Sequence, residues 1–323
     1  MQSTHIDAAN LVTQHDLDSL LEPIHRLLAR PVAGAFGPNS ITWRINRESA
    51  LFLAAGRAAL LQLAHPWVAN AIQQHSSVLS KPIARFHNTF RIVFTTIFGS
   101  ANQAFAAARS LHGLHTNIRG QLTSPVAGYK QGSPYEANFI PALRWVYATL
   151  IESAVLAYEV VLPPLTEAER EAYYSESKVF ASFFGIPAAA LPPDWLSFLA
   201  YVNGMCASDA LGVDSTSREM GQSLLRGAGS WIHLPHWYRA LTAEWMPPRF
   251  RDEFGLRFAD AEQQSAQRAQ RWLPRVYRKL PSSLRFVGPY QEACARLAQK
   301  KPGPLIRRSN QFWIGEPRMP FAE

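Results

Sequence analysis

The chain has 323 residues, of which 47% are hydrophobic and 17% charged, and its formal net charge at pH 7 is +8. This composition is that of a folded globular protein, and it excludes collagen-like, low-complexity and largely disordered chains. The Lys and Arg residues are scattered, without a basic block in which aromatic residues are interleaved, so the sequence favours a solvated basic surface over a nucleic acid partner.

The first strong helical segment, residues 47–64, is apolar nearly all round, as is typical of a central helix in a soluble protein. It contains Arg57 and Gln62 and stops before Pro66, well short of the roughly 20 apolar residues that a membrane span needs. The segment therefore predicts a buried core helix, and we expect no transmembrane segment. A second helix is predicted at about 67–76.

Two further helices are predicted at about 82–98 and 101–119. The first carries a stripe of Phe and Ile residues at helical spacing. The second opens with Ser100 and Gln103, which form the pattern of a capping box, and it ends at Gly120.

The rest of the chain is also mainly helical. Residues 121–137, rich in Gly, Pro, Ser and Gln, predict a loop. Further helices are predicted at about 139–160, 166–183 (opened by a capping box of Thr166 and Glu169), 194–206, 235–245, 259–271 and 288–299. Because strand-like alternation is scarce, we expect an all-α fold in which residues 1–323 form a single helical domain.

The two cysteines, Cys206 and Cys294, lie far apart, so the sequence predicts neither a disulfide framework nor a zinc site. Residues 1–23 contain three aspartates and lack the basic-then-apolar layout of a secretory signal. Both observations agree with a reducing, cytoplasmic setting, which we take as the expected localisation.

Two histidines stand three residues apart in the helix at 101–119. Helical periodicity puts His115 near the centre of an apolar stripe and His112 toward its edge. A polar group that faces the core without a partner costs roughly 1–3 kcal/mol. His115 therefore needs a hydrogen-bond partner or a metal, and the spacing alone leaves both open.

The helix at 82–98 carries a second unusual face, which includes Arg85, Asn88 and Thr89. A solvated face normally holds more Lys and Glu than this one does. Arg85 and Thr89 are four residues apart, so they stand one turn above the other and would contact a ligand jointly. The alternative is a surface face with a few hydroxyl groups.

Motifs of other chemistries are missing from the sequence. There is no nucleotide-binding glycine loop, no HExxH zinc motif, no GxSxG nucleophile elbow and no calcium loop. Asp209 and Asp214 are the nearest approach to a carboxylate pair, and they are best interpreted as solvated loop residues. An iron site of two histidines and one carboxylate cannot be assembled from local spacing.

Five segments of the chain do form a recognisable series. They are GRAALLQLAHPWVANAIQQHS (56–76), RFHNT (85–89), HTNIRG (115–120), RWVYATLIES (144–153) and FFGIP (183–187). In this order they resemble the catalytic domain of the oxygenase MpaB and rubber oxygenase family, which includes the latex-clearing proteins. The resemblance runs from about residue 45 to 205 and more loosely to about 300.

The resemblance implies a globin-like helical domain around a pocket that holds haem b through one proximal histidine. That histidine corresponds to His115, the first residue of the family's H-x-x-V-x-G pattern, here with Ile118 in place of Val. His112 corresponds to a neighbouring histidine beside the cofactor that does not bind iron. The expected metal ligand is therefore His115 alone.

The family's distal R-x-x-K-T pattern maps to Arg85, Asn88 and Thr89, which are the expected catalytic residues. Arg85 and Thr89 would donate hydrogen bonds to bound dioxygen. Asn88 replaces a lysine that can occupy the sixth iron position, so an open or water-bound distal position is expected. Tyr147, expected at the cofactor, replaces a histidine, and only the Gln73–Gln74 pair lies near the family's acidic base. These departures argue against polyisoprene cleavage and leave haem binding intact.

Arg57 is a further candidate for the cofactor pocket. An arginine in an apolar helix is costly unless it is paired with an anion, and a haem propionate would supply one. An internal carboxylate would serve equally. His65 and His75 also recur in the family and are interpreted as structural.

Together these features predict a haem b-dependent oxygenase, an oxidoreductase that activates O2 for oxidative cleavage or oxygenation of an apolar small molecule such as an isoprenoid. Three alternatives stay open. They are a haem peroxidase-like or monooxygenase activity, a non-enzymatic haem- or gas-binding protein, and a family member that has lost haem.

Overall fold

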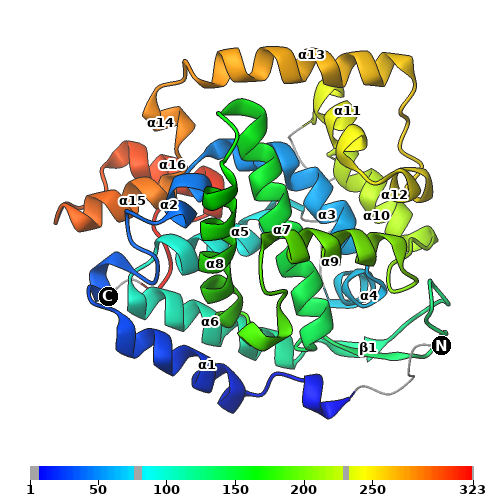
Figure 1. The fold of residues 1–323 in the computed structure, drawn as a ribbon, viewed down its shortest axis with the longest axis horizontal. Helices are drawn as coiled ribbons and strands as arrows, with labels where there is room; N and C mark the ends of the chain where they lie inside the picture. Colours follow the sequence, from blue (N-terminus) through cyan, green and yellow to red (C-terminus); the bar gives the residue numbers. More distant parts are fainter. Residues whose placement is uncertain (1–6, 76–81, 228–232, 322–323) are drawn as a thin grey trace.

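Helices dominate the computed structural model, which describes residues 7–75, 82–227 and 233–321 (Figure 1). The α-helices are α1 (Gln14–Leu27), α2 (Ile41–Asn46), α3 (Ala55–Leu63), α4 (Pro66–His75), α5 (Pro82–Phe98), α6 (Ala101–Thr116), α7 (Ile140–Val161), α8 (Glu167–Ser182), α9 (Trp195–Ala207), α10 (Ser215–Arg226), α11 (His236–Trp245), α12 (Pro248–Glu253), α13 (Asp260–Tyr277), α14 (Ser282–Arg285), α15 (Gly288–Leu297) and α16 (Pro304–Ile314). Within the described residues, the sheet structure is limited to two short strands, β1 (Arg119–Gln121) and β2 (Pro134–Glu136). The predicted all-α class is confirmed.

The long helix α7 forms the centre of the fold (Figure 1) and packs against α3, α8, α9 and α13. Trp145, fully buried on α7, donates its indole N–H to the Leu61 carbonyl of α3 at 2.8 Å. By length and composition α7 would be able to cross a membrane, but 61% of its apolar window is buried inside the molecule. It therefore lies where a core helix of a globular protein lies.

The segment predicted as one helix at 47–64 is divided into two parts. Residues Ser49–Ala54 form a 3₁₀ helix, η3, and α3 begins at Ala55. The hydroxyl of Tyr238 bridges the junction, because it accepts from the Gly56 N–H at 3.0 Å and donates to the Phe52 carbonyl at 2.9 Å. A side chain distant in sequence thus satisfies backbone groups that a continuous α-helix would otherwise pair.

The predicted loop at 121–137 contains one half of a hairpin that the sequence does not reveal. The helix before it ends at Thr116 rather than near 119, and β1 then pairs with β2 in antiparallel register, with Gly120 opposite Tyr135. A Cβ at Gly120 would lie 2.7 Å from the Tyr135 hydroxyl, so this close approach requires glycine. Three-residue strands are too short to produce a detectable alternation.

Two predicted helix starts are confirmed in detail. The Ser100 and Thr166 side chains accept from the N–H groups of Gln103 and Glu169, and both capping boxes are complete. The first of them opens α6, which packs side by side with α5. The pair α5–α6 supplies two of the walls of the site. Among the described residues, six helices have no counterpart among the predicted elements; they are α1, α2, α10, α12, α14 and α16.

Candidate active site

A cavity of about 620 Å³ lies between α4, α5, α6 and α7, and the β1–β2 hairpin and the C-terminal segment complete its wall. This volume is within the range of about 300–1,000 Å³ that small-molecule and cofactor pockets occupy. We call it the first cavity. Its apolar lining includes Val68, Ile72, Ile92, Leu111, Leu114, Ile118, Leu143, Val146 and Phe184.

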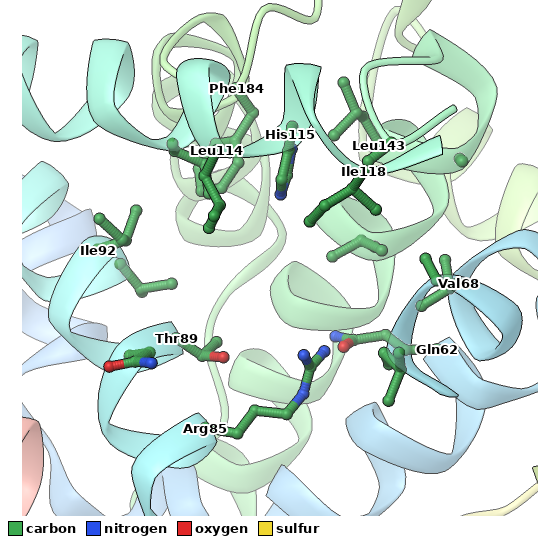
Figure 2. A pocket seen from close by; sticks show the side chains of 18 of the residues that line it. Gln62, Val68, Arg85, Thr89, Ile92, Leu114, His115, Ile118, Leu143 and Phe184 are labelled. Atoms are coloured by element: carbon green, nitrogen blue, oxygen red, sulfur yellow. The ribbon is translucent and has the colours of Figure 1, made fainter. Parts of the chain in front are cut away.

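His115 projects into the first cavity from the last turn of α6 (Figure 2). Burial lowers the pKa of its imidazole to about 4, and the nearby His112 and Arg85 contribute to the same direction. The ring is therefore neutral at pH 7, and one of its nitrogens carries a lone pair that is able to bind a metal. His115 lies on the apolar face predicted for this helix, and this face borders the first cavity.

Asn138, in the turn between β2 and α7, lies next to His115. Its amide nitrogen donates to the Thr116 hydroxyl at 3.2 Å and to the His112 carbonyl at 3.3 Å. A hydrogen bond with Asn138 raises the pKa of His115, against the larger effect of burial. Since the amide nitrogen is used in these two bonds, the amide oxygen is the atom that would accept from the imidazole, and such an acceptor would fix the orientation of a ligating histidine. No sequence signal pointed to Asn138.

Arg85 and Thr89 lie one turn apart on α5, across the first cavity from His115, with Gln62 of α3 beside Arg85 (Figure 2). Burial lowers the pKa of the Arg85 guanidinium, which nevertheless remains charged at neutral pH. Asn88 lines the same cavity. The structure therefore brings the three predicted distal residues and His115 to one cavity.

Tyr147 also lines the first cavity, but its hydroxyl is turned into the protein. The Tyr147 hydroxyl lies 2.6 Å from that of Ser177, which in turn donates to the Tyr174 carbonyl at 2.6 Å. Burial raises the pKa of Tyr147 above its ordinary value. Tyr147 therefore offers the cavity the surface of its ring and remains protonated.

Two of the predicted cofactor contacts lie outside the wall of the first cavity. Arg57 binds Glu152 at 2.7 Å, the Ser153 hydroxyl at 3.0 Å and the Trp245 carbonyl at 2.9 Å. Of the two partners left open for Arg57, the structure thus shows the internal carboxylate. His112 donates from Nε2 to the Val12 carbonyl at 2.9 Å, which turns its ring away from His115.

Several charged residues of the first cavity were missed in the sequence. Glu136 comes from β2, and Arg91 of α5 forms an ion pair with Glu316 at 3.1 Å. They belong to segments that meet only in the folded chain, so no local spacing connects them. Trp67 also lines the cavity, and its buried indole N–H has no hydrogen-bond partner among the described residues.

The remaining family-related polar residues hold the backbone. His75 bonds from Nε2 to the Arg119 carbonyl at 3.1 Å, and Gln74 donates to the Gln121 carbonyl at 2.9 Å and accepts from the Tyr135 hydroxyl at 2.8 Å. His65 is 4% exposed, and its Nδ1 accepts from the Trp67 N–H. His75 also lines the first cavity, while His65 and Gln74 do not.

A second cavity of about 670 Å³ adjoins the first. The residues common to both are Gln62, Ile72, Arg85, Thr89, Val93, Leu150 and Phe180. Its lining is dominated by aliphatic and aromatic side chains, among them Phe52, Phe90 and Trp313. Arg85 and Thr89 thus stand where the first cavity, which contains His115, meets the second cavity.

In the residues that the structure describes, no three His, Cys, Asp or Glu side chains gather in the manner of a metal cluster. The sequence profile described as "ER-bound oxygenase mpaB/B'/Rubber oxygenase, catalytic domain" matches residues 42–279. The chain is also 27% identical, over 232 residues, to the uncharacterized protein Mb2261 of Mycobacterium bovis and to the uncharacterized protein Rv2237 of Mycobacterium tuberculosis. In both cases the match covers 68% of this chain and 84% of the relative. No solved structure gives a significant match.

Proposed function

The chain belongs to the family of ER-bound oxygenase mpaB and rubber oxygenase catalytic domains, and from this premise we propose that it is a haem b-dependent oxygenase in which His115 would hold the haem iron. Membership of the family makes it an oxygenase, an enzyme that acts with O2. The dependence on haem and the assignment of His115 are the steps that the proposal adds. The observation that carries them is the neutral imidazole of His115, aimed into a cavity of about 620 Å³.

The residues of the first cavity fit a haem group. A b-type haem needs an axial imidazole, a largely apolar enclosure and groups that satisfy its two carboxylates. His115 with Asn138 behind it supplies the first, and the aliphatic lining supplies the second. The indole N–H of Trp67, which has no partner among the described residues, is the donor on the wall that would meet a carboxylate, whereas Arg91 is already bound by Glu316 and the Ile314 carbonyl. When bound, the iron would supply the reduction and activation of O2, for which no amino-acid side chain suffices.

Arg85 and Thr89 serve the reaction from the opposite wall. A guanidinium and a hydroxyl held by one helix are preorganised donors for negative charge that develops on oxygen between them and His115. The low polarity of the surrounding side chains strengthens this interaction. Asn88 adds an amide in place of a cation, and Arg85 is the cation that stands one turn from Thr89.

The second cavity supports an apolar substrate. Its aromatic and aliphatic lining would hold a hydrocarbon chain, and the shared residues Arg85 and Thr89 mark the place where that chain would meet the oxygen site. Oxygenation or cleavage of a carbon–carbon double bond in such a molecule is the reaction class that this arrangement serves.

The test is the absorption spectrum of the purified protein, expressed with a haem precursor, together with pyridine haemochrome quantification. We expect one haem b per chain in the wild type and in His112→Ala, and a loss of most haem in His115→Ala. His112→Ala is the matched control, because it removes a histidine one turn away that does not line the cavity. Equal haem content in the two variants would remove the basis for His115 as ligand.

The haem-loaded protein then separates the reaction classes. Products from an apolar alkene under O2 support the oxygenase. Products with hydrogen peroxide but not with O2 indicate a peroxidase-like enzyme, and reversible O2 binding without turnover indicates a gas-binding protein.

A further inference from the structure

Helix α16 carries an exposed apolar stripe. Leu305 is 79% exposed and Phe312 is 50% exposed. Arg308 lies on the same face, because residues three, four and seven positions apart share one side of a helix. The opposite face holds Asn310 and Ile314, both 0% exposed, and α16 packs against α5 and α15. We call Leu305, Arg308 and Phe312 the α16 stripe.

The charged residues from position 293 to 315 are all cations, and the next acid, Glu316, is paired with Arg91. The exposed cations of this region are Lys300, Lys301, Arg307 and Arg308, while the partly buried Arg296 donates to the Val32 and Phe98 carbonyls. Exposed apolar side chains flanked by Lys and Arg are typical of a helix that lies on an anionic lipid surface.

Phe312 connects the stripe with the second cavity. Phe312 and its neighbour Gln311 are both exposed and both line that cavity, so its mouth opens beside α16. Just inside, the ring of Trp313 stacks on that of Phe52 with centroids 4.2 Å apart, and Phe90 follows at 4.6 Å from Phe52. An apolar surface therefore continues from the outside of α16 into the interior.

We infer that the α16 stripe docks the protein on a membrane surface that contains anionic lipids. Leu305 and Phe312 enter the interfacial layer, while the four cations contact the headgroups. The mouth of the second cavity then faces the lipid, and an apolar ligand passes from the bilayer into the cavity without crossing water. The docking rests on α16 alone, whereas the passage of a substrate also rests on the proposed function.

Two other exposed apolar sites lack this combination. Leu196 on α9 is 77% exposed, but it stands two residues from Asp194, and no Lys or Arg occurs in α9. On α13, which also carries arginines, Trp272 is 37% exposed and Val276 is 50% exposed. Neither residue lines the first or the second cavity. These sites supply the controls for the test.

The test is flotation of the haem-loaded, full-length protein with vesicles of phosphatidylcholine alone or of equimolar phosphatidylcholine and phosphatidylglycerol. We expect binding to the anionic vesicles that weakens as salt rises, and little binding to the neutral ones. One cation near an anionic surface contributes about fivefold to the partition coefficient, so the charge reversal Arg308→Glu lowers it by roughly twentyfold. Leu305→Glu acts in the same direction, while Leu196→Glu, a substitution at a leucine of equal exposure, leaves binding unchanged.

Three results would overturn the inference. They are absence of binding to anionic vesicles, equal binding by the wild type and Leu305→Glu, and loss of binding on Arg271→Glu in α13 but not on Arg308→Glu. The haem content of each sample is measured in parallel. Because vesicle binding is scored without turnover, failure of the docking and failure of the oxygenase proposal give different results.

Discussion

Two arginines in apolar helices of this protein have different surroundings. Arg57 of α3 is 5% exposed, and its guanidinium is bound by Glu152, Ser153 and the Trp245 carbonyl. Arg85 of α5 lies where two cavities meet, opposite His115 (Figure 2). The partners of Arg57 enclose its guanidinium, whereas the Arg85 side chain lies in the wall of the space where a ligand would bind.

The difference shows what makes a buried cation structural. A charge removed from water needs an opposite charge or several hydrogen bonds. At Arg57 the fold supplies them from α7 and from the end of α11, so nothing is left for a ligand. The Arg85 side chain lines two cavities, each large enough for a ligand. Four predictions separate the two regions.

The largest effect is expected at Arg85. Arg85→Ala removes a charged donor from the reaction site, and loss of one such donor lowers turnover by about 10²- to 10³-fold. Haem content and stability should stay near the wild-type values, because Arg85 is not placed as a ligand. Arg85→Lys, which keeps the charge but loses the planar fork, should recover part of the rate. Unchanged turnover of Arg85→Ala at full haem loading would contradict the role.

The second largest effect is expected for the ion pair of Arg57 and Glu152, and it is a loss of folding stability. Glu152→Ala leaves the Arg57 guanidinium without its carboxylate, which costs about 3 kcal/mol in the free energy of unfolding. Urea unfolding measures this change. The double substitution Arg57→Met with Glu152→Leu should regain most of it, since it removes both charges. If Glu152→Ala instead lost haem at unchanged stability, Arg57 would have a cofactor role after all.

A smaller effect is expected at Asn138, which bonds the turn before α7 to the end of α6, next to His115. Asn138→Ala removes the amide oxygen that would orient the His115 imidazole, and it should weaken haem binding by about 10- to 100-fold. Asn117→Ala is the matched control, because Asn117 at the end of α6 is exposed and donates only to the Gly113 carbonyl. The rate of haem transfer to an acceptor apoprotein is measured for both variants. Equal transfer rates for Asn138→Ala and Asn117→Ala would argue against the orienting role of Asn138.

The smallest effect concerns pH. Burial lowers the pKa of His65 and of His115 to about 4, from an ordinary value of 6.5. Between these values the unfolded chain binds more protons than the folded apoprotein, so the free energy of unfolding falls as pH drops from 6.5 toward 4 and is level above 6.5. Urea unfolding of the apoprotein at several pH values checks this. Burial raises the pKa of Glu292, which acts in the opposite sense. The wild type is therefore compared with His65→Gln, in which Glu292 is unchanged. In this variant the free energy of unfolding should fall less steeply as pH drops from 6.5 toward 4.

Much of the architecture follows from local signals in the sequence. Proline positions and capping boxes at Ser100 and Thr166 place α5, α6, α7 and α8, since these signals act within a few residues. The hairpin of β1 and β2 and the division between η3 and α3 escape prediction, because contacts with Tyr135 and Tyr238, distant in sequence, decide them. A globin-like order of the helices stays a prediction.

The candidate site shows the same limit. Helical spacing identifies the face with His115 and the face with Arg85 and Thr89, and the structure brings them to one cavity. Helical spacing does not identify Asn138, which lies between the loop predicted at 121–137 and the helix predicted at 139–160. It also does not identify the carboxylate of Glu152, which is 95 residues from Arg57. Partners of buried charges are set by tertiary packing, so spacing leaves them undetermined.

The central claim, that His115 holds the cofactor, is tested most directly by His115→Gly with and without imidazole in the buffer. The glycine variant removes the imidazole side chain while leaving a space for a free imidazole molecule. We predict loss of the haem absorption band without imidazole and its return at one haem per chain when imidazole is added, with His112→Gly unaffected in both conditions. A full haem band in His115→Gly without imidazole would contradict the account.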